Sequence, residues 1–325
     1  MIGLRIALAS VALLISAAPS GHAQSYPSRA ITLVVPFPAG GGNDALARLV
    51  AERMSKTLGQ QVVVENRGGA GGTIATRAIA KGAADGYAIL LTYTGTLAIN
   101  PSLYPNAGYD PRKDFAPIGA IGTLVSVLVA HPSLPASNLK EFIAYAKANP
   151  GKLNYASPGS GSQNRLEMEV LRKLVGLDMV HVPYKGGAGP AIAGLIGGET
   201  HVMFVTAPSA MSGVKAGRLK ILGVTSDKRL EQVPTAPTMS EQGYSELKTS
   251  SWQGVFVPAG TPREIVERLH AVLHQAMATP EVAARLASGG VEVVTSPSPA
   301  AFADYVAAET QRWAKVVKES NATPD

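Results

Sequence analysis

The stretch ITLVVPFPAGGGNDALARLVAERMSKTL, residues 31–58, decides the fold of this chain. It predicts an apolar strand, a proline- and glycine-rich turn, and an amphipathic helix over residues 44–58. Asn43 or Asp44 is expected to cap the helix, and Gly59 stands where a left-handed residue ends it. Such a turn points free backbone N–H groups at whatever lies above the helix N-terminus. Because the turn lacks the Lys-Ser/Thr pair of a phosphate loop, it favours a carboxylate over a nucleotide.

The first 23 residues are typical of an export signal. Arg5 supplies the positive charge, a short apolar run follows, and Gly21 and Ala23 are the small residues before a cleavage site. The apolar run is too short to span a bilayer, and no later stretch is long enough. We therefore expect a periplasmic protein, cleaved near Ala23.

Composition excludes several classes of protein. The 325 residues include no cysteine, which excludes a disulfide scaffold and thiol catalysis. The formal net charge is +6, but the basic residues are scattered, whereas a nucleic-acid-binding protein usually concentrates them. Dispersed positive charge fits attraction of small anions and equally fits ordinary solubility.

Short apolar strands alternate with helical segments along the chain, which predicts an α/β fold with parallel sheets. The expected strands cover residues 31–36, 61–65, 88–93, 125–130, 154–157, 179–182, 202–206 and 221–225. The expected helices cover residues 44–58, 73–80, 139–149, 163–176, 191–196, 262–278, 280–288 and 299–319.

Two long apolar strands, at residues 117–131 and 252–259, interrupt this alternation. The segment between them forms a self-contained α/β block. The simplest topology has the chain leave one lobe, build a second and return, so that the two strands form a hinge beside a cleft. Lobe 1 would comprise residues 24–124 and 252–325, and lobe 2 residues 125–251.

A second anion-site candidate is LNYASPGSGSQNRLEMEVLRKL, residues 153–174. A strand leads through a serine- and glycine-rich loop into a helix that carries Arg165 in its first turn. Serine hydroxyls, backbone N–H groups and the guanidinium could surround one carboxylate. The alternative is a simple turn in which Ser162 only caps the helix.

Three further loops follow strands, at residues 93–96, 184–190 and 206–209. Ligands gather at the carboxyl ends of strands in open α/β sheets, so the five loops together predict one polar pocket. Each loop taken singly is better explained as a turn, so the prediction depends on their convergence. The candidate ligand-binding residues are Pro38, Ala39, Gly40, Gly41, Gly42, Asn43, Asp44, Thr94, Gly95, Ser157, Gly159, Ser160, Gly161, Ser162, Arg165, Tyr184, Thr206 and Ala207.

Other patterns do not support catalysis or a cofactor. VVVENRGGAGGTI, residues 62–74, fails the last glycine of a dinucleotide fingerprint and is interpreted as a tight turn. His270 and His274 have the spacing of two metal ligands, but no third ligand is apparent. His181 is expected in the core or on a pocket wall. There is no G-x-S-x-G elbow, so we expect no enzyme, no cofactor and no metal.

With these motifs in hand, the chain resembles the substrate-binding proteins of tripartite tricarboxylate transporters, the Bug-type receptors. The matching stretches keep the family's order over nearly all of the chain after residue 25. They include YPSRAITLVVPFPAGGGND (26–44), LGQQVVVENRGGAGG (58–72), DGYAILL (85–91), NYASPGSGS (154–162), HVPYKGGAGPAIAGLIGGETHVMF (181–204), LGVTSDKR (222–229), PTAPTMSEQGY (234–244) and WQGVFVPAGTP (252–262).

The resemblance implies a two-lobed periplasmic-binding-protein fold of type II that closes on a small carboxylate and delivers it to a membrane permease. In such proteins one carboxylate commonly meets the loop that matches residues 38–43. The loop that matches residues 157–162 lines the other side, often through backbone amides and bridging waters.

Three positions depart from the family pattern. Family members often have His at the position of Arg165, Pro at that of Gly68 and Asp at that of Gly194. The two glycines are expected to alter only local structure. A fixed cation at Arg165 would favour a doubly charged or bulkier acid.

The leading hypothesis is a receptor for a di- or tricarboxylate or an aromatic acid, and nothing in the sequence demands more than a monomer. An exported enzyme that acts on small acids, and a binding protein that presents its ligand to a sensor, remain as alternatives.

Overall fold

The computed structural model describes residues 26–39, 42–184, 187–288, 291–320 and 322. Its strands are β1 (Ile31–Val35), β2 (Val62–Asn66), β3 (Ala88–Tyr93), β4 (Phe115–Ala130), β5 (Asn154–Ser157), β6 (Val180–Pro183), β7 (Val202–Thr206), β8 (Lys220–Val224), β9 (Ser250–Pro258) and β10 (Val291–Glu292). Its α-helices are α2 (Gly42–Leu58), α3 (Thr73–Ala80), α4 (Asn100–Leu103), α5 (Leu139–Ala148), α6 (Gln163–Val175), α7 (Ala188–Ile196), α8 (Ala207–Lys215), α9 (Arg263–Met277), α10 (Pro280–Ser288) and α11 (Pro299–Ser320).

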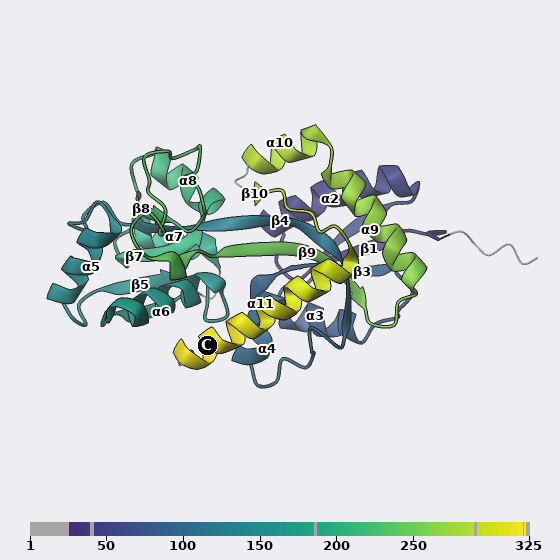
Figure 1. Cartoon of the computed structure of the whole chain (residues 1–325), viewed down its shortest axis with the longest axis horizontal. Coiled ribbons are helices and arrows are strands. Elements are labelled where there is room, and N and C mark those ends of the chain that lie inside the picture. The colour runs from purple at the N-terminus through teal and green to yellow at the C-terminus, as the bar shows by residue number, and fades with distance from the viewer. Residues whose placement is uncertain (1–25, 40–41, 185–186, 289–290, 321, 323–325) are drawn as a thin grey trace, which may run out of the picture.

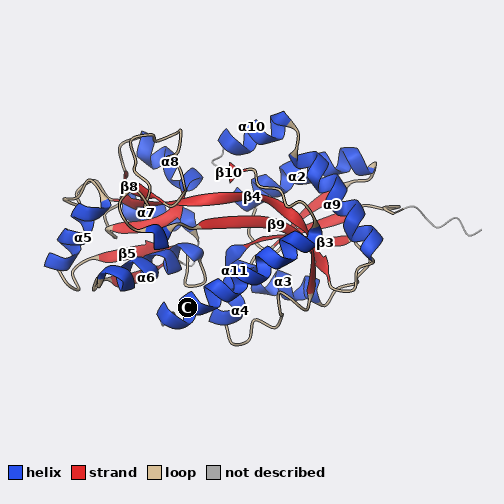
Figure 2. Ribbon diagram, viewed as in Figure 1, coloured by secondary structure: helices blue, strands red, loops and turns tan. Residues whose placement is uncertain are grey.

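The long strands β4 and β9 cross the middle of the molecule as an antiparallel pair (Figures 1 and 2). The strand order is β2-β1-β3-β9-β4-β7-β5-β6, and β8 and β10 also pair with β4. β4 pairs with β9 as far as Val125, and with β7 from Ser126 onward. Strand β4 therefore joins a sheet of β1, β2, β3 and β9 to a second sheet of β5 to β8.

The predicted parallel pairing is confirmed at the outer strands, where β1 pairs parallel with β2 and β3, and β5 with β6 and β7. The central strands are antiparallel to their neighbours. The sheet is therefore mixed, because the chain passes from one half to the other and back again.

Helices cover both faces of each half because strand side chains alternate between faces. On β1, Ile31, Leu33 and Val35 pack in one core cluster with residues of α2 and α9. Val34 joins the opposite cluster with residues of α3 and α11. The second half is built in the same way, with Leu128 on one face of β4 and Val127 on the other.

The predicted helix after β1 is confirmed with one correction at its start. Helix α2 begins at Gly42, so Asn43 and Asp44 lie in its first turn rather than before it. Asp44 still complements the helix dipole there. Gly59 adopts a φ of 67° and donates to Ser55 O at 3.1 Å, as expected for a left-handed C-cap.

Two helical segments were expected as loops. Helix α8 begins directly after β7, with Pro208 in the first turn, where proline is tolerated. A π-helical turn, Gly95–Ile99, and α4 follow β3. Both segments are rich in small residues and also contain Ser and Pro. This composition is typical of loops, although the backbone here is helical.

Helix α11 extends from the first half of the molecule to α6 of the second (Figure 1). Leu166 of α6 packs in one cluster with Trp313 and Val317, and Lys173 Nζ donates to Glu319 O at 3.3 Å. No helix in the part of the chain that the structure describes is long and apolar enough to cross a membrane.

Candidate functional site

A cavity of about 940 Å³ lies where loops from both halves of the molecule meet. The candidate residues on its wall are Pro38, Asn43, Gly159, Ser160, Gly161, Ser162 and Thr206. Loops after β1, β5 and β7 thus line one space, and Tyr93 and Gly187 of the other two predicted loops line it as well, as the convergence argument predicts. Gly40 and Gly41 lie outside the described residues, but the flanking Pro38 and Asn43 line the same cavity as Ser160.

The loop over residues 157–162, here the serine loop, is held by its own hydrogen bonds. Ser162 is the N-cap of α6: its Oγ accepts from Arg165 N at 3.3 Å and donates to Gly159 O at 2.7 Å. Ser157 Oγ accepts from Gly159 N at 3.2 Å. The structure thus shows the capping role that the sequence left as an alternative, and it also places Ser162 on the cavity wall.

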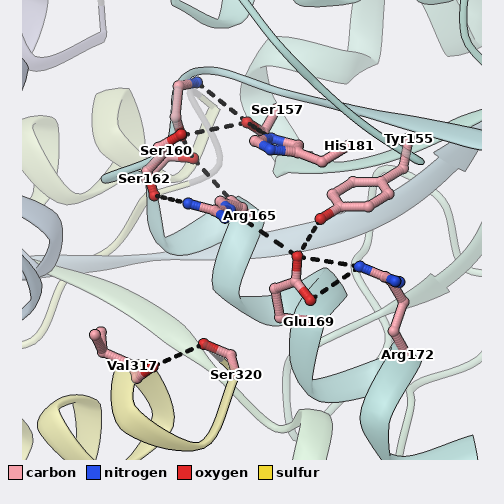
Figure 3. A network of polar contacts seen from close by, with 11 residues as sticks. Tyr155, Ser157, Ser160, Ser162, Arg165, Glu169, Arg172, His181, Val317 and Ser320 are labelled. Atoms are coloured by element: carbon pink, nitrogen blue, oxygen red, sulfur yellow. Dashed lines mark hydrogen bonds and ion pairs between the residues drawn. The ribbon is translucent and has the colours of Figure 1, made fainter. Parts of the chain in front are cut away.

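The Arg165 guanidinium lies between the serine loop and Glu169 (Figure 3) and is not on the cavity wall. The side chain is buried; Nη1 donates to Ser160 O at 3.4 Å, and Nε lies 4.0 Å from Glu169 Oε1. Glu169 also accepts from Arg172 and from the Tyr155 hydroxyl. Arg165 is therefore placed to support the loop, which corrects the expectation that its guanidinium would surround the ligand.

Ser157 and His181 form a hydrogen-bonded pair, with Ser157 Oγ 2.7 Å from His181 Nε2. The pair has the atoms of a nucleophile and a base, but Ser157 is fully buried and is not on the cavity wall. The His181 ring stacks on Tyr155 at 4.9 Å. The pair therefore braces the base of the serine loop.

The remaining candidates do not form part of the cavity wall. Thr94 is buried, and its Oγ1 accepts from Trp252 N at 2.9 Å, which ties the end of β3 to β9. The carboxylate of Asp44 forms an ion pair with Arg48 at 3.0 Å. The others that the structure places off the wall are Ala39, Gly95, Tyr184 and Ala207, and whether Gly42 lines the wall lies outside what the structure describes.

The sequence interpretation missed a third glycine-rich wall, residues 69–72, which was assigned to a structural turn. Its four residues Gly69, Ala70, Gly71 and Gly72 all have positive φ, and helix α3 begins directly after them. Two glycine pairs, Gly68-Gly69 and Gly71-Gly72, before a helix-forming segment were the available signal, but the segment does not match the dinucleotide pattern.

Asn100 and Tyr104, at α4, connect this wall to the serine loop. Asn100 Nδ2 donates to Gly71 O at 3.0 Å. On the other side, a Cβ at Gly161 would lie 2.7 Å from Asn100 Oδ1 and 3.1 Å from the Tyr104 hydroxyl. The absence of a side chain at Gly161 is what allows the serine loop to approach α4 this closely.

Arg285 of α10 is the one charged side chain among the described residues on the cavity wall. The other wall residues are polar or apolar, including Phe37, Tyr93, Leu124 and Gln253. Apart from Arg285, the described wall residues are uncharged and offer backbone and hydroxyl groups. Such a wall with one positive charge suits a small anion. No local pattern points to Arg285, because α10 is distant in the chain from all five predicted loops.

Glu167 lies one turn of α6 beyond the serine loop and is fully buried. Its Oε1 accepts from Gln163 Nε2 at 2.9 Å and from Thr249 Oγ1, and its Oε2 accepts from Asn164 Nδ2 at 3.1 Å. Burial raises the pKa of the Glu167 carboxyl, although these hydrogen bonds act in the opposite direction.

No group of three His, Cys, Asp or Glu side chains that could hold a metal ion occurs among the described residues. The His270 and His274 rings lie 6.1 Å apart, and His270 Nδ1 is 2.8 Å from Ile118 O. The contact with Ile118 gives His270 a structural role between α9 and β4.

The sequence model of one protein family, described as the tripartite tricarboxylate transporter family receptor, matches residues 46–322, which is most of the chain. The chain belongs to this family. It is therefore a solute receptor of the binding-protein type and not an enzyme.

Solved structures of the family agree with this assignment. The structure of periplasmic binding protein BugD shares 37% identity and a TM-score of 0.82, over 92% of this chain and 100% of that one. Rpa4515 of R. palustris with adipate shares 36% identity and a TM-score of 0.85, over 92% and 100%. MatC of Rhodopseudomonas palustris with bound malate shares 34% identity and a TM-score of 0.81, over 90% and 100%.

Gly194 makes room for Tyr184. A Cβ at Gly194 would lie only 2.1 Å from the Tyr184 hydroxyl, which donates to Glu199 Oε2 at 2.8 Å. The glycine thus permits a bond that holds Tyr184 against α7.

Replacing Arg165 by alanine is expected to weaken binding of mono- and dicarboxylates by similar factors. The guanidinium acts on Ser160 O and Glu169 rather than on the cavity, so its loss loosens the serine loop for every ligand. Calorimetry with a monoacid and a diacid checks this. A loss confined to the diacid would restore Arg165 as a direct contact.

Proposed function

We propose that this receptor binds a di- or tricarboxylate or an aromatic acid in the cavity and delivers it to the permease of a tripartite tricarboxylate transporter. The proposal rests mainly on one observation: loops after β1, β5 and β7 line one cavity whose described wall includes a single charged side chain, Arg285. The adipate and malate bound to the two R. palustris relatives support a carboxylate ligand.

We further propose that the cavity is an interlobe cleft. Lobe 1 would comprise residues 24–124 and 252–325, and lobe 2 residues 125–251. The partner change of β4 between Val125 and Ser126 supports this boundary. Closure of the lobes would then change which surfaces lie side by side, and a permease could recognise that change.

The proposed ligand-binding wall residues are Pro38, Asn43, Gly159, Ser160, Gly161, Ser162 and Thr206. Pro38, which has no backbone N–H, contributes only apolar contact, and the others contribute backbone N–H and hydroxyl groups. Hydrogen bonds to a charged group contribute about 1.5–3 kcal/mol each. A micromolar Kd requires about −8 kcal/mol, so a few such bonds in a closed cleft are sufficient.

Thermal-shift screening tests the ligand class. A carboxylate at about one hundred times its Kd is expected to add about 2.7 kcal/mol to the free energy of unfolding, because it binds only the folded chain. The panel comprises mono-, di- and tricarboxylates and aromatic acids, with the corresponding amides as uncharged controls. Stabilisation by the amides equal to that by the acids would contradict a carboxylate site.

Delivery to a permease requires a separate test, because a receptor that presents its ligand to a sensor would bind equally well. Deletion of the gene should abolish growth on the ligand as sole carbon source if the role is uptake. Normal growth with loss of a transcriptional response would favour sensing.

We also propose that the chain is exported, cleaved near Ala23 and active as a monomer. The charged, apolar and small-residue regions of the first 23 residues support export, and these residues lie outside the part that the structure describes.

A further inference from the structure

Glu167 is placed to fix the orientation of two amide side chains that line the cavity. Gln163 and Asn164 are both wall residues, and both direct their amide nitrogen to the Glu167 carboxylate. An ionised carboxylate only accepts hydrogen bonds, so it selects the amide nitrogen over the amide oxygen. Asn164 Nδ2 is fixed further by Ser126 Oγ at 3.0 Å.

The amide oxygens are the atoms of these side chains that the described part of the protein leaves without a donor. Gln163 is only 2% exposed, and its Oε1 accepts no hydrogen bond from any described residue. Gln253 of β9 is a wall residue with 1% exposure, and its Oε1 is likewise without a partner among the described residues. Two buried acceptors from different elements therefore lie at one cavity without a donor.

A buried acceptor without a donor is unfavourable, and an amide oxygen repels a carboxylate. A ligand that carries a hydrogen-bond donor would satisfy these oxygens, whereas an unsubstituted acid would leave them unpaired. The site therefore binds a ligand that lacks the donor less tightly, because such a ligand leaves the buried amide oxygens unpaired.

We infer that Gln163, oriented by Glu167, forms with Gln253 a subsite for a hydrogen-bond donor carried by the ligand, so that the receptor prefers a substituted acid to its unsubstituted analogue. The inference rests on the proposed carboxylate function and adds the ligand's second recognition element. Gln163 and Gln253 determine specificity, and Glu167 is a positioning residue that acts through Gln163.

Calorimetry with succinate, malate and aspartate tests the subsite, because these diacids differ only in carrying hydrogen, hydroxyl or ammonium at one carbon. We expect malate or aspartate, depending on whether a neutral or a cationic donor fits, to bind about 5- to 10-fold more tightly than succinate, the worth of one hydrogen bond. Adipate and 2-hydroxyadipate repeat the comparison at a length that fills more of the cavity.

Glu167→Gln should reduce the ratio of the affinities for the substituted and the unsubstituted acid. An amide at position 167 can donate to Gln163 Oε1, so the Gln163 amide is no longer held in a single orientation. Affinity for the unsubstituted acid should rise, a gain that a merely structural role of Glu167 would not produce. Gln163→Leu should also reduce the ratio, by removing the acceptor. Gln275→Leu, on the exposed surface of α9, is the matched control and should leave the ratio unchanged.

The outcomes separate this inference from the proposed function. If the acids bind but substituted and unsubstituted members bind alike, the subsite is wrong and the carboxylate receptor stands. The same holds if both variants fold, as judged by thermal melting, and keep the wild-type ratio. If no acid of the thermal-shift panel binds, the proposed function and the subsite are both wrong.

Discussion

Replacing Gly161 by valine should lower ligand affinity by about 5- to 150-fold, the equivalent of the 1–3 kcal/mol that overpacking usually costs. Gly161 lacks a positive φ, so its backbone accepts a side chain. The obstacle is contact: a Cβ would lie 2.7 Å from Asn100 Oδ1, and Asn100 is buried and bonded to Gly71 O. Valine would therefore keep the serine loop away from α4.

Calorimetry on the variant measures this effect, and thermal melting without ligand checks the fold. Gly189→Val is the matched control, because a Cβ at Gly189 meets nothing within 4 Å. The control should bind as the wild type does. Wild-type affinity in Gly161→Val itself would mean that contact between the serine loop and α4 is not part of the ligand-bound state.

Replacing Phe302 by alanine should destabilise the protein by about 3–5 kcal/mol, the usual cost of removing a buried aromatic side chain. Phe302 of α11 is 1% exposed and packs against Trp252 and Phe256 of β9, with ring centroids 5.7 and 5.4 Å away. The melting temperature should fall on the order of 10 °C for a chain of this size. Phe302→Leu should cost less because it leaves a smaller cavity.

A double-mutant cycle with Gly254 gives a sharper test of the same contact. A Cβ at Gly254 would lie 2.4 Å from Phe302 Cζ, so Gly254→Ala should destabilise the wild type. In the Phe302→Ala background that space is open, and the cost of Gly254→Ala should fall. Simple additivity of the two changes would show that the ring does not occupy this position.

Most of the elements follow from local patterns. The strands at 88–93, 154–157 and 202–206 and the helices at 73–80 and 280–288 are confirmed residue for residue. Apolar alternation and helical periodicity act over a few residues and are visible in sequence. Helix α8 was missed because APSAMSGVK lacks a strong apolar period, and its packing against β4 and β7 stabilises it instead.

The candidate site was predictable where a glycine or serine loop follows a strand. The loops after β1, β5 and β7 do share one cavity. Arg165 shows the limit of that reasoning, because position in a helix's first turn does not decide which way a long side chain points. Its carboxylate partner, Glu169, lies one turn away on the same helix and draws the guanidinium away from the cavity.

The sequence alone determined the family, the α/β alternation and the two glycine- and serine-rich loops, because each is encoded by neighbouring residues. Tertiary structure alone decided that residues 69–72, Arg285 and Gln253 join those loops at one cavity, and that Glu167 orients Gln163 beside it. These contacts join residues that are far apart in the chain. Strand order and the packing of α6 and α10 bring these residues together, and neither can be predicted from a local sequence pattern.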